Sequence, residues 1–264
     1  MPSLDQRHAS PLVKVLLLGE SKTGKTGALA SLARAGYKLL ILDFDNGLDY
    51  LFAELRNEPE ILRNIHSETF RDRVTLDTMG NVKLKSSAKA FANAMKALDN
   101  GIDGLGPAEE LGPEWIVVPD SLWSAGRAAF YEHKKLQPSN DPRQNYFGAQ
   151  QMIMAMLERL TDASFNAHVI VMTHMTLVEM ENNITREFPS AIGKAICTDI
   201  PKLFNRMLVA QTKGAGKGTK RVISTVPVRT LAATSGEVKG AVPEELPIET
   251  GLATFFSAIT RGGI

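Results

Sequence analysis

The pattern that most constrains the fold lies in residues 13–26, VKVLLLGESKTGKT. A short run of β-formers leads to Gly19, and Gly24, Lys25 and Thr26 complete the spacing G-x-x-x-x-G-K-[ST] of a phosphate-binding loop. The two glycines let the backbone curl so that successive N–H groups point at phosphate oxygens. Lys25 then reaches the β- and γ-phosphates, and the Thr26 hydroxyl binds magnesium. The sequence therefore predicts a strand and a phosphate loop in that order.

A helix is expected directly after this loop, because Ala and Leu recur at helical spacing in GALASLARAG, up to Gly36. The N-terminus of such a helix adds favourable partial charge toward a bound anion. An ordinary glycine-rich turn is the alternative, and the position between an apolar strand and an amphipathic helix disfavours it. We predict that the nucleotide contacts nine consecutive residues: Gly19, Glu20, Ser21, Lys22, Thr23, Gly24, Lys25, Thr26 and Gly27.

Length and composition favour one α/β domain at 13–264, preceded by a flexible N-terminal arm at 1–12. The 264 residues suffice for a large core, and the net charge of +1 creates no global field that would attract nucleic acid. The single cysteine, Cys197, forms no internal disulfide, which predicts a reducing compartment. No signal-peptide core is evident, and no apolar run approaches the roughly 18 residues of a membrane span. We therefore expect a cytoplasmic protein without a membrane partner.

The first acidic candidate follows the apolar run 38–44, KLLILDF, which reads as a central parallel strand. Ligands bind at the carboxyl ends of such strands, so Asp45 is well placed to hold a water molecule or magnesium. The alternative is that Asp45, Asn46 and Gly47 form only a turn that caps the next helix. The residues alone favour both readings about equally.

Two further strands end in polar residues. The strand 115–118 is followed by Pro119, Asp120 and Ser121, the form expected of a Walker B motif, whose carboxylate holds magnesium directly or through water. The strand 168–172 ends in Thr173 and His174, at the same edge of the sheet. His174 is a candidate γ-phosphate sensor, although a solitary histidine more often has an ordinary structural role.

The remaining periodicity predicts helices at 48–65, interrupted near Pro59, and at 87–98, 122–136, 146–163 and 252–259, with strands at 73–76, 206–211, 222–226 and 228–232. Residues from about 205 to 260 are thus expected to form a C-terminal hairpin and helix packed on the core. Loops are expected at 100–113, 138–145 and 176–196, and a loop as long as the last is uncommon unless it has a function.

Basic residues gather in two places, the loop 176–196 and the glycine-rich hairpin tip near 213–221. They are candidates for contacting DNA phosphates or for reaching a neighbouring subunit as an arginine finger. A solvated hairpin tip is an equally good reading. The candidate residues are Arg186, Lys194, Lys213, Lys217, Lys220 and Arg221.

Taken together, GESKTGKT, LLILDFDNGLDY, WIVVPDS and VIVMTH resemble the motifs of the RecA-like ATPase core in order and spacing, over roughly residues 11–234. The chain looks closest to small phage-encoded RecA-type ATP-binding proteins, a group that includes single-strand-annealing recombinases. It does not resemble the ParA/MinD type, which needs a second lysine where this chain has Glu20. In the RecA-like family the loop after the sensor strand commonly contacts DNA.

This resemblance implies an α/β fold with a mainly parallel central sheet flanked by helices, and an ATPase that uses ATP and Mg²⁺. It assigns the activation of water to Asp45, where the family usually has Glu, and γ-phosphate sensing to His174, where the family often has Gln. Lys25 would hold the phosphates, and Thr26 and Asp120 the magnesium.

The expected activity is slow hydrolysis coupled to single-stranded DNA in recombination, annealing or repair, in the cytoplasm of a phage host, with self-association through the ATPase core. One alternative is a nucleotide-dependent switch that recruits replication or packaging partners with little hydrolysis. Another is a small-molecule phosphotransferase. That reading predicts an arginine-rich lid, and no such arginine cluster is evident in the sequence.

Overall fold

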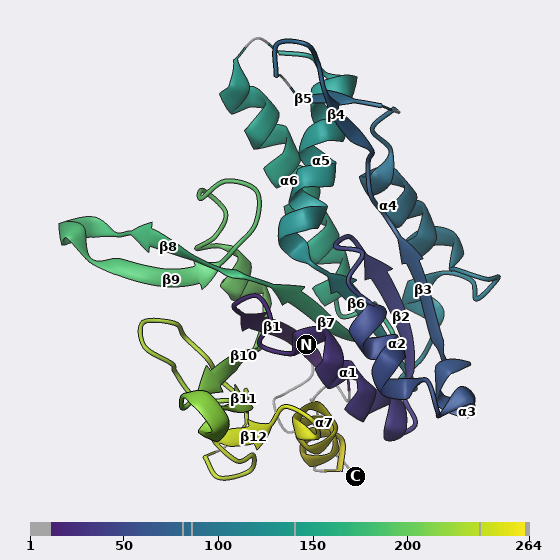
Figure 1. The fold of residues 1–264 in the computed structure, drawn as a ribbon, viewed down its shortest axis with the longest axis vertical. Coiled ribbons are helices and arrows are strands. Elements are labelled where there is room, and N and C mark those ends of the chain that lie inside the picture. Colours follow the sequence, from purple (N-terminus) through teal and green to yellow (C-terminus); the bar gives the residue numbers. More distant parts are fainter. Residues whose placement is uncertain (1–11, 81, 86, 140, 238, 262–264) are drawn as a thin grey trace, which may run out of the picture.

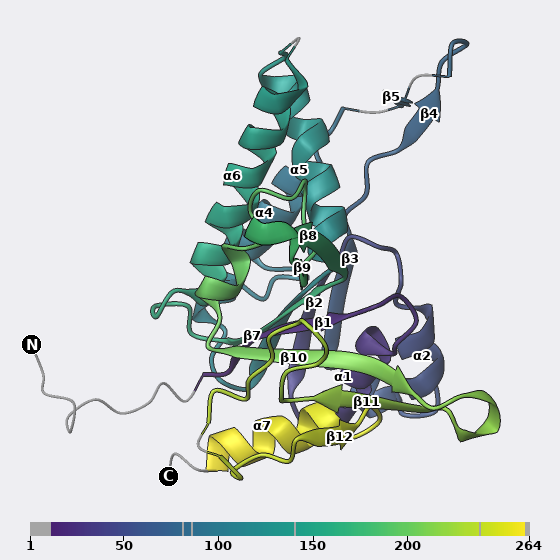
Figure 2. The same ribbon diagram turned by 90° about the vertical axis from the view of Figure 1, so that its left-hand side faces the viewer.

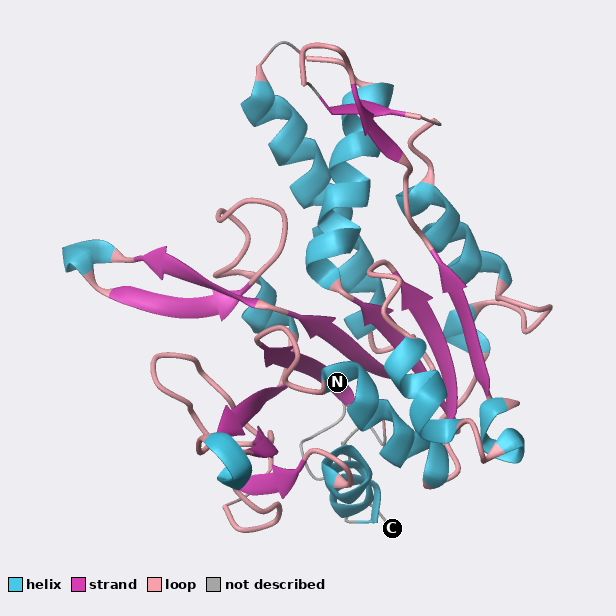
Figure 3. Ribbon diagram, viewed as in Figure 1, coloured by secondary structure: helices cyan, strands magenta, loops and turns pink. Residues whose placement is uncertain are grey.

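The computed structural model describes residues 12–80, 82–85, 87–139, 141–237 and 239–261, so the predicted N-terminal arm lies outside the described residues except for Leu12. An eight-stranded sheet forms the centre of the molecule (Figures 1 and 3). Its strands are β1 (Lys14–Gly19), β2 (Lys38–Asp43), β3 (Ile65–Thr69), β6 (Trp115–Asp120), β7 (His168–Thr173), β10 (Arg206–Lys213), β11 (Lys220–Ser224) and β12 (Glu245–Pro247).

The strand order is β12-β11-β10-β1-β7-β6-β2-β3. The strands from β10 to β3 run parallel, and β11 and β12 continue the sheet antiparallel at the C-terminal edge. This arrangement confirms the predicted α/β class, the mainly parallel sheet and the C-terminal hairpin.

Helices cover both faces of the sheet, as Figure 2 shows. One face carries α1 (Lys25–Arg34), α2 (Asp49–Leu55), α3 (Pro59–Leu62) and α7 (Gly251–Arg261), and the other carries α4 (Ala90–Asn100), α5 (Leu122–Leu136) and α6 (Pro142–Thr161). In the part of the chain that the structure describes, no helix is both long and apolar enough to cross a membrane.

Alternation along the strands divides the core into two layers. In β1, Leu16 and Leu18 pack into the layer beneath α4, α5 and α6, whereas Val15 and Leu17 pack into the layer beneath α1 and α7. All four side chains are fully buried, because successive residues of a strand point to opposite faces and both faces here are covered. The continuous apolar runs in the sequence reflect this double burial.

Two antiparallel hairpins extend away from the sheet (Figures 1 and 2). The first joins β4 (Val74–Leu76) to β5 (Val82–Leu84), and the second joins β8 (Met175–Glu179) to β9 (Thr185–Pro189). The second corrects the loop predicted at 176–196. Its strands, MTLVE and TREFP, are short and mix polar with apolar residues without a regular alternation, so the sequence shows neither pattern that predicts a strand.

Three other predicted elements differ from the structure. The helix expected at 48–65 is interrupted near Pro59 as predicted, because α2 ends at Leu55 and Pro59 begins α3, but α3 ends at Leu62 and the chain then enters β3. The strand expected at 228–232 is only an isolated bridge, and β12 occupies the sheet edge beside β11. Helix α6 begins at Pro142 rather than 146, because Asp141 accepts a hydrogen bond from the Arg143 N–H and so caps the helix.

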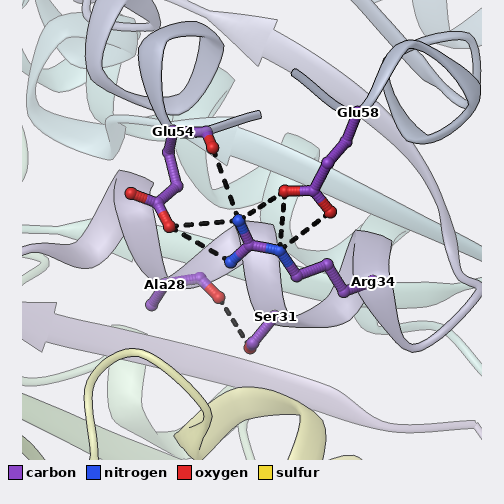
Figure 4. Close-up of polar contacts among 5 residues, drawn as sticks. All are labelled: Ala28, Ser31, Arg34, Glu54 and Glu58. Atoms are coloured by element: carbon purple, nitrogen blue, oxygen red, sulfur yellow. Dashed lines mark hydrogen bonds and ion pairs between the residues drawn. The ribbon is translucent and has the colours of Figure 1, made fainter. Parts of the chain in front are cut away.

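An ionic cluster fixes α1 against α2 (Figure 4). The Arg34 guanidinium, in the last turn of α1, lies 3.1 Å from Glu54 Oε1 and 2.7 Å from Glu58 Oε1. Nearby, the Ser31 hydroxyl donates to the Ala28 carbonyl at 2.8 Å. The forked guanidinium thus links the last turn of α1 to the C-terminal end of α2, in addition to the packing of Leu51 and Leu55 into the core.

Candidate nucleotide-binding site

The segment between β1 and α1 has the shape of a phosphate loop for reasons visible at its glycines. A Cβ on Gly19 would lie 2.6 Å from the Ala210 carbonyl oxygen of the neighbouring β10, and Gly24 has a φ of +96°. A Cβ on Gly27 would lie 2.5 Å from the Tyr50 ring. The backbone oxygen beside Gly19 and the left-handed backbone of Gly24 therefore require glycine at these two positions, whereas the neighbour of Gly27 is an exposed side chain.

Lys25 begins α1 and is buried, with its side chain turned back over the loop. Its Nζ donates to the carbonyl oxygens of Gly19 at 2.8 Å and Glu20 at 3.0 Å. Burial lowers the pKa of Lys25, while the carboxylates of Asp120 and Asp45 oppose that shift. An ammonium held in this way is available to phosphate oxygens, which compete favourably with neutral carbonyls for a cation.

Thr26 and Asp120 form the second polar pair. The Thr26 hydroxyl donates to Asp120 Oδ2 at 2.7 Å, and Asp120 lies buried at the end of β6. Burial raises the pKa of Asp120 to about 6, although the Thr26 hydrogen bond opposes this. A hydroxyl beside a carboxylate fits the oxygen ligands that Mg²⁺ prefers. Because the described residues contain no group of three or more His, Cys, Asp or Glu side chains able to hold a metal ion, phosphate and water oxygens would have to complete that shell.

The two aspartates after β2 have different environments. Asp43 is buried, and its Oδ1 accepts the N–H groups of Asp45 at 3.1 Å and Gly47 at 3.3 Å, while burial raises its pKa. Asp45 instead lines the nucleotide cavity, and its carboxylate accepts a hydrogen bond from the Ser124 hydroxyl of α5. The turn that the sequence suggested as an alternative therefore exists, and Asp43 holds it.

His174 follows β7 and lies beside the phosphate loop. Its Nδ1 is 3.3 Å from the Gly19 carbonyl oxygen, so this contact requires the proton on Nδ1. Burial lowers the pKa of His174, and the Lys25 charge lowers it further. The ring is consequently neutral at physiological pH and able to act as a hydrogen-bond donor.

A cavity of about 450 Å³ unites these groups. Besides the phosphate loop, its wall contains Asp45, Asp120, His174, Tyr50 and Arg221. Tyr50 was missed in the sequence because it follows the acidic motif in an ordinary helical pattern. Ser124 donates a hydrogen bond to Asp45 from outside the cavity wall and was also missed. The sequence feature that could have indicated its role is its position in the first turn of the helix after Asp120.

The predicted basic residues separate into different environments. Arg221 lies in the wall of the chain's own nucleotide cavity, and a Cβ on Gly24 would be 3.5 Å from its Cδ. Lys213 forms an ion pair with Glu245 of β12. Lys220 lies directly opposite Lys213 in the antiparallel register of β10 and β11. Arg186 and Lys194 are exposed, on β9 and after it, and the Lys217 side chain lies outside the described part of the structure.

A mainly parallel sheet with a phosphate loop at its carboxyl edge and antiparallel strands beyond β10 defines a RecA-like P-loop NTPase. Residues 12–235 match the family AAA_24, described as an AAA domain. Since the match spans most of the chain, the protein belongs to this family.

Solved structures similar to the chain include the RadB recombinase, with 16% identity and a TM-score of 0.45 over 86% of each chain. A KaiC-like protein from Pyrococcus horikoshii has 13% identity and a TM-score of 0.43 over 80% of this chain and 77% of its own. The flagellar accessory protein FlaH from Methanocaldococcus jannaschii has 8% identity and a TM-score of 0.41 over 90% and 87%. Identities this low describe only a similarity of fold. No curated protein matches the sequence significantly.

Proposed function

We propose that the protein is a phage-encoded, Mg-ATP-hydrolysing ATPase that acts on single-stranded DNA in recombination, annealing or repair. It would work in the host cytoplasm and self-associate through the ATPase core. One observation carries the proposal: residues from four separate motifs converge on a single cavity at the phosphate loop. They are Lys25, Thr26, Asp45, Asp120 and His174.

In this proposal the triphosphate lies on the loop, where backbone N–H groups and the Lys25 ammonium bind its oxygens. Thr26 and Asp120 would hold Mg²⁺, which when bound supplies positive charge to the β- and γ-phosphates. The short distance between the hydroxyl and the carboxylate suits this role. Deprotonation of Asp120 is required, so magnesium binding should weaken as the pH falls through about 6.

Asp45 would take a proton from the attacking water, and the Ser124 hydroxyl would hold its carboxylate in position. The neutral His174 has a single N–H, so it would have to turn its Nδ1–H from the Gly19 carbonyl to the γ-phosphate to donate a hydrogen bond there. Because Asp is one methylene shorter than the Glu usual in RecA-like ATPases, its reach toward the γ-phosphate is reduced. We therefore expect slow turnover.

Coupling to DNA is supported by the hairpin that follows the sensor position. The Ser190 N–H, at the end of this hairpin, donates to the His174 carbonyl at 2.8 Å, and Thr173 donates to the Ser190 carbonyl at 2.5 Å. Arg186 on β9 is exposed. DNA bound along the hairpin would thus act on a segment bonded directly to the sensor.

The test is the ATPase rate with and without single-stranded DNA at two salt concentrations, with Lys25→Ala as the blank. We expect stimulation that weakens as salt rises, because phosphate contacts release counterions. Asp45→Asn should retain ATP affinity and lose turnover. Unchanged ATP affinity in Lys25→Ala would overturn the nucleotide assignment, whereas turnover indifferent to DNA would overturn only the coupling.

A nucleotide-dependent switch that recruits replication or packaging partners is the second candidate. The short Asp45 side chain, already engaged by Ser124, favours it. This function predicts tight ATP binding with no measurable turnover, with or without DNA.

A further inference from the structure

A second, small cleft adjoins the nucleotide cavity. It encloses about 70 Å³ between α5 and the segment that leads from β3 into β4. Ser124 lines this cleft and donates its hydroxyl hydrogen bond to Asp45, which lines the nucleotide cavity. Arg71 also lines the cleft, and its Nη1 donates to the Asp45 carbonyl oxygen at 3.4 Å. Two residues of the cleft therefore contact Asp45, the proposed catalytic residue: Ser124 contacts its carboxylate and Arg71 its backbone carbonyl.

The cleft carries excess positive charge. Arg71 and Arg127 line it, both are exposed, and neither forms an ion pair with a described carboxylate. The acidic residue in the wall, Asp72, uses its Oδ1 to accept the N–H groups of Lys89 at 3.0 Å and Ala90 at 3.2 Å at the start of α4. A helix N-terminus offsets much of such a charge. Two guanidinium groups thus remain available to an anion.

Beside the cleft, α5 presents a stripe of aromatic and cationic side chains. Trp123, Arg127 and Tyr131 follow one another at four-residue spacing and so share a helix face. The Arg127 guanidinium lies 5.2 Å from the Trp123 ring centroid and 5.8 Å from that of Tyr131, and its Nη2 donates to the Tyr131 hydroxyl at 3.0 Å. Trp123 nevertheless remains 40% exposed. Part of the Trp123 ring, beside the Arg127 cation, is therefore open to solvent.

This combination fits one class of ligand. Single-stranded nucleic acid offers both unpaired bases, which stack on exposed aromatic rings, and phosphates, which bind guanidinium groups. Double-stranded DNA offers the phosphates but keeps its base faces inside the stack. An acidic peptide offers charge without a planar base.

We propose that Trp123, Arg127, Tyr131 and Arg71 form a binding surface for single-stranded DNA that acts on Asp45 through Ser124. The inference rests on the proposed function and extends it, because this surface is distinct from the hairpin that carries Arg186. Trp123 and Arg127 flank Ser124 in the first turns of α5. A strand bound there engages the same turn of helix that positions the Asp45 carboxylate.

Binding is tested by titrating the full chain with oligo(dT) and following both anisotropy of a labelled strand and intrinsic tryptophan fluorescence. The chain has two tryptophans, and Trp115 is buried, so Trp123 should report stacking by quenching. We expect Trp123→Ala to weaken oligo(dT) binding about tenfold, in the range of one lost base stack. Arg127→Ala should weaken it and reduce its salt dependence. Phe147→Ala, at an exposed aromatic on α6, is the matched control and should bind as the wild type does.

The outcomes separate this inference from the proposed function. If the wild type binds oligo(dT) and both α5 variants bind equally well, with ATP affinity unchanged, the α5 surface is wrong and the DNA function stands. If the wild type does not bind oligo(dT), the DNA function fails, and this inference fails with it. Competition by duplex DNA as effective as that by oligo(dT) would overturn the stacking role of Trp123.

The link to Asp45 has its own test, because Ser124 is a positioning residue. Ser124→Ala should lower kcat about tenfold, both with and without oligo(dT), and leave KM for ATP and the oligo(dT) affinity unchanged. Ser124→Thr retains the hydroxyl and should restore most of the rate. An unchanged DNA-stimulated kcat in Ser124→Ala would overturn the proposed route through Ser124.

Discussion

The buried carboxylate of Asp120, which the proposed function requires in its ionised form, lowers the stability of the folded protein at neutral pH. Burial raises the pKa of Asp120 to about 6 from an ordinary 3.8. The folded state therefore holds the proton more tightly than the unfolded state, and this favours folding at low pH. The contribution is lost as the pH rises through the folded-state value, so the ionised carboxylate costs about 3 kcal/mol of unfolding free energy at pH 7.5.

We predict that Asp120→Asn abolishes Mg²⁺-dependent hydrolysis and raises the free energy of unfolding at pH 7.5 by up to about 3 kcal/mol. The amide retains an oxygen that can accept the Thr26 hydroxyl, so packing should be preserved. Urea unfolding of the two proteins at pH 7.5 and pH 4.5 provides the measurement. A stability difference that stays constant between these pH values would contradict the assignment of the shift to Asp120.

At the scale of elements, the sequence predicted the strands buried on both faces and missed those at the edges. Strands β1, β2, β6 and β7 are continuous apolar runs, because helices cover both sides of the sheet. Strand β3 has the mostly polar sequence IHSET and pairs in parallel with β2 at the edge of the sheet, where Ile65 packs against the apolar core. The phosphate loop and three polar strand ends were placed at one edge by the same logic, whereas Tyr50 and Ser124 come from helices, whose pattern does not distinguish them from ordinary surface residues.

The β10–β11 hairpin carries a prediction at this scale. Since β11 brings Arg221 into the chain's own cavity, its guanidinium should contact the bound nucleotide in cis. We expect Arg221→Ala to raise the Kd for ATP about five- to tenfold, the loss of a charge-assisted contact. The neighbouring Lys220→Ala is the matched control, because Lys220 does not line this cavity. Equilibrium binding over a range of protein concentrations gives the measurement.

A cis contact makes the effect of Arg221→Ala independent of protein concentration. Mixing Arg221→Ala with Lys25→Ala should then restore no activity, because the two defects lie in one site. Recovery of ATPase activity in the mixture would mean that Arg221 serves a neighbouring subunit and would contradict the cis role.

Across the whole molecule, His168 joins segments that are far apart in the sequence. Its Nδ1 accepts the Val13 N–H at 2.8 Å, and its ring packs edge-on against Tyr37 and Phe256. This contact holds together the start of β1, the start of β7, the turn after α1 and the C-terminal helix α7. Burial lowers the pKa of His168 to about 4. Protonation of the ring would remove the acceptor for Val13, so the fold requires the neutral form.

The sign of the His168 contribution is opposite to that of Asp120. Its folded-state pKa lies below the ordinary 6.5, so its stabilisation is complete above pH 6.5 and is lost as the pH falls toward 4. The loss amounts to about 3 kcal/mol, similar in size to the gain from protonating Asp120 over nearly the same range. The two contributions should largely cancel, and the wild-type stability should vary little from this source between pH 6.5 and 4.

Replacing either residue should therefore reveal the pH dependence of stability that the other residue causes. We predict that His168→Asn, which retains an acceptor for Val13, gains stability relative to the wild type as the pH falls from 7 to 4.5, whereas Asp120→Asn loses it. Urea unfolding of the three proteins at pH 7, 5.5 and 4.5 measures the slopes, and the double variant should restore a nearly flat profile if the sites are independent. Both single variants retaining the wild-type slope would mean that the pH response lies elsewhere in the molecule.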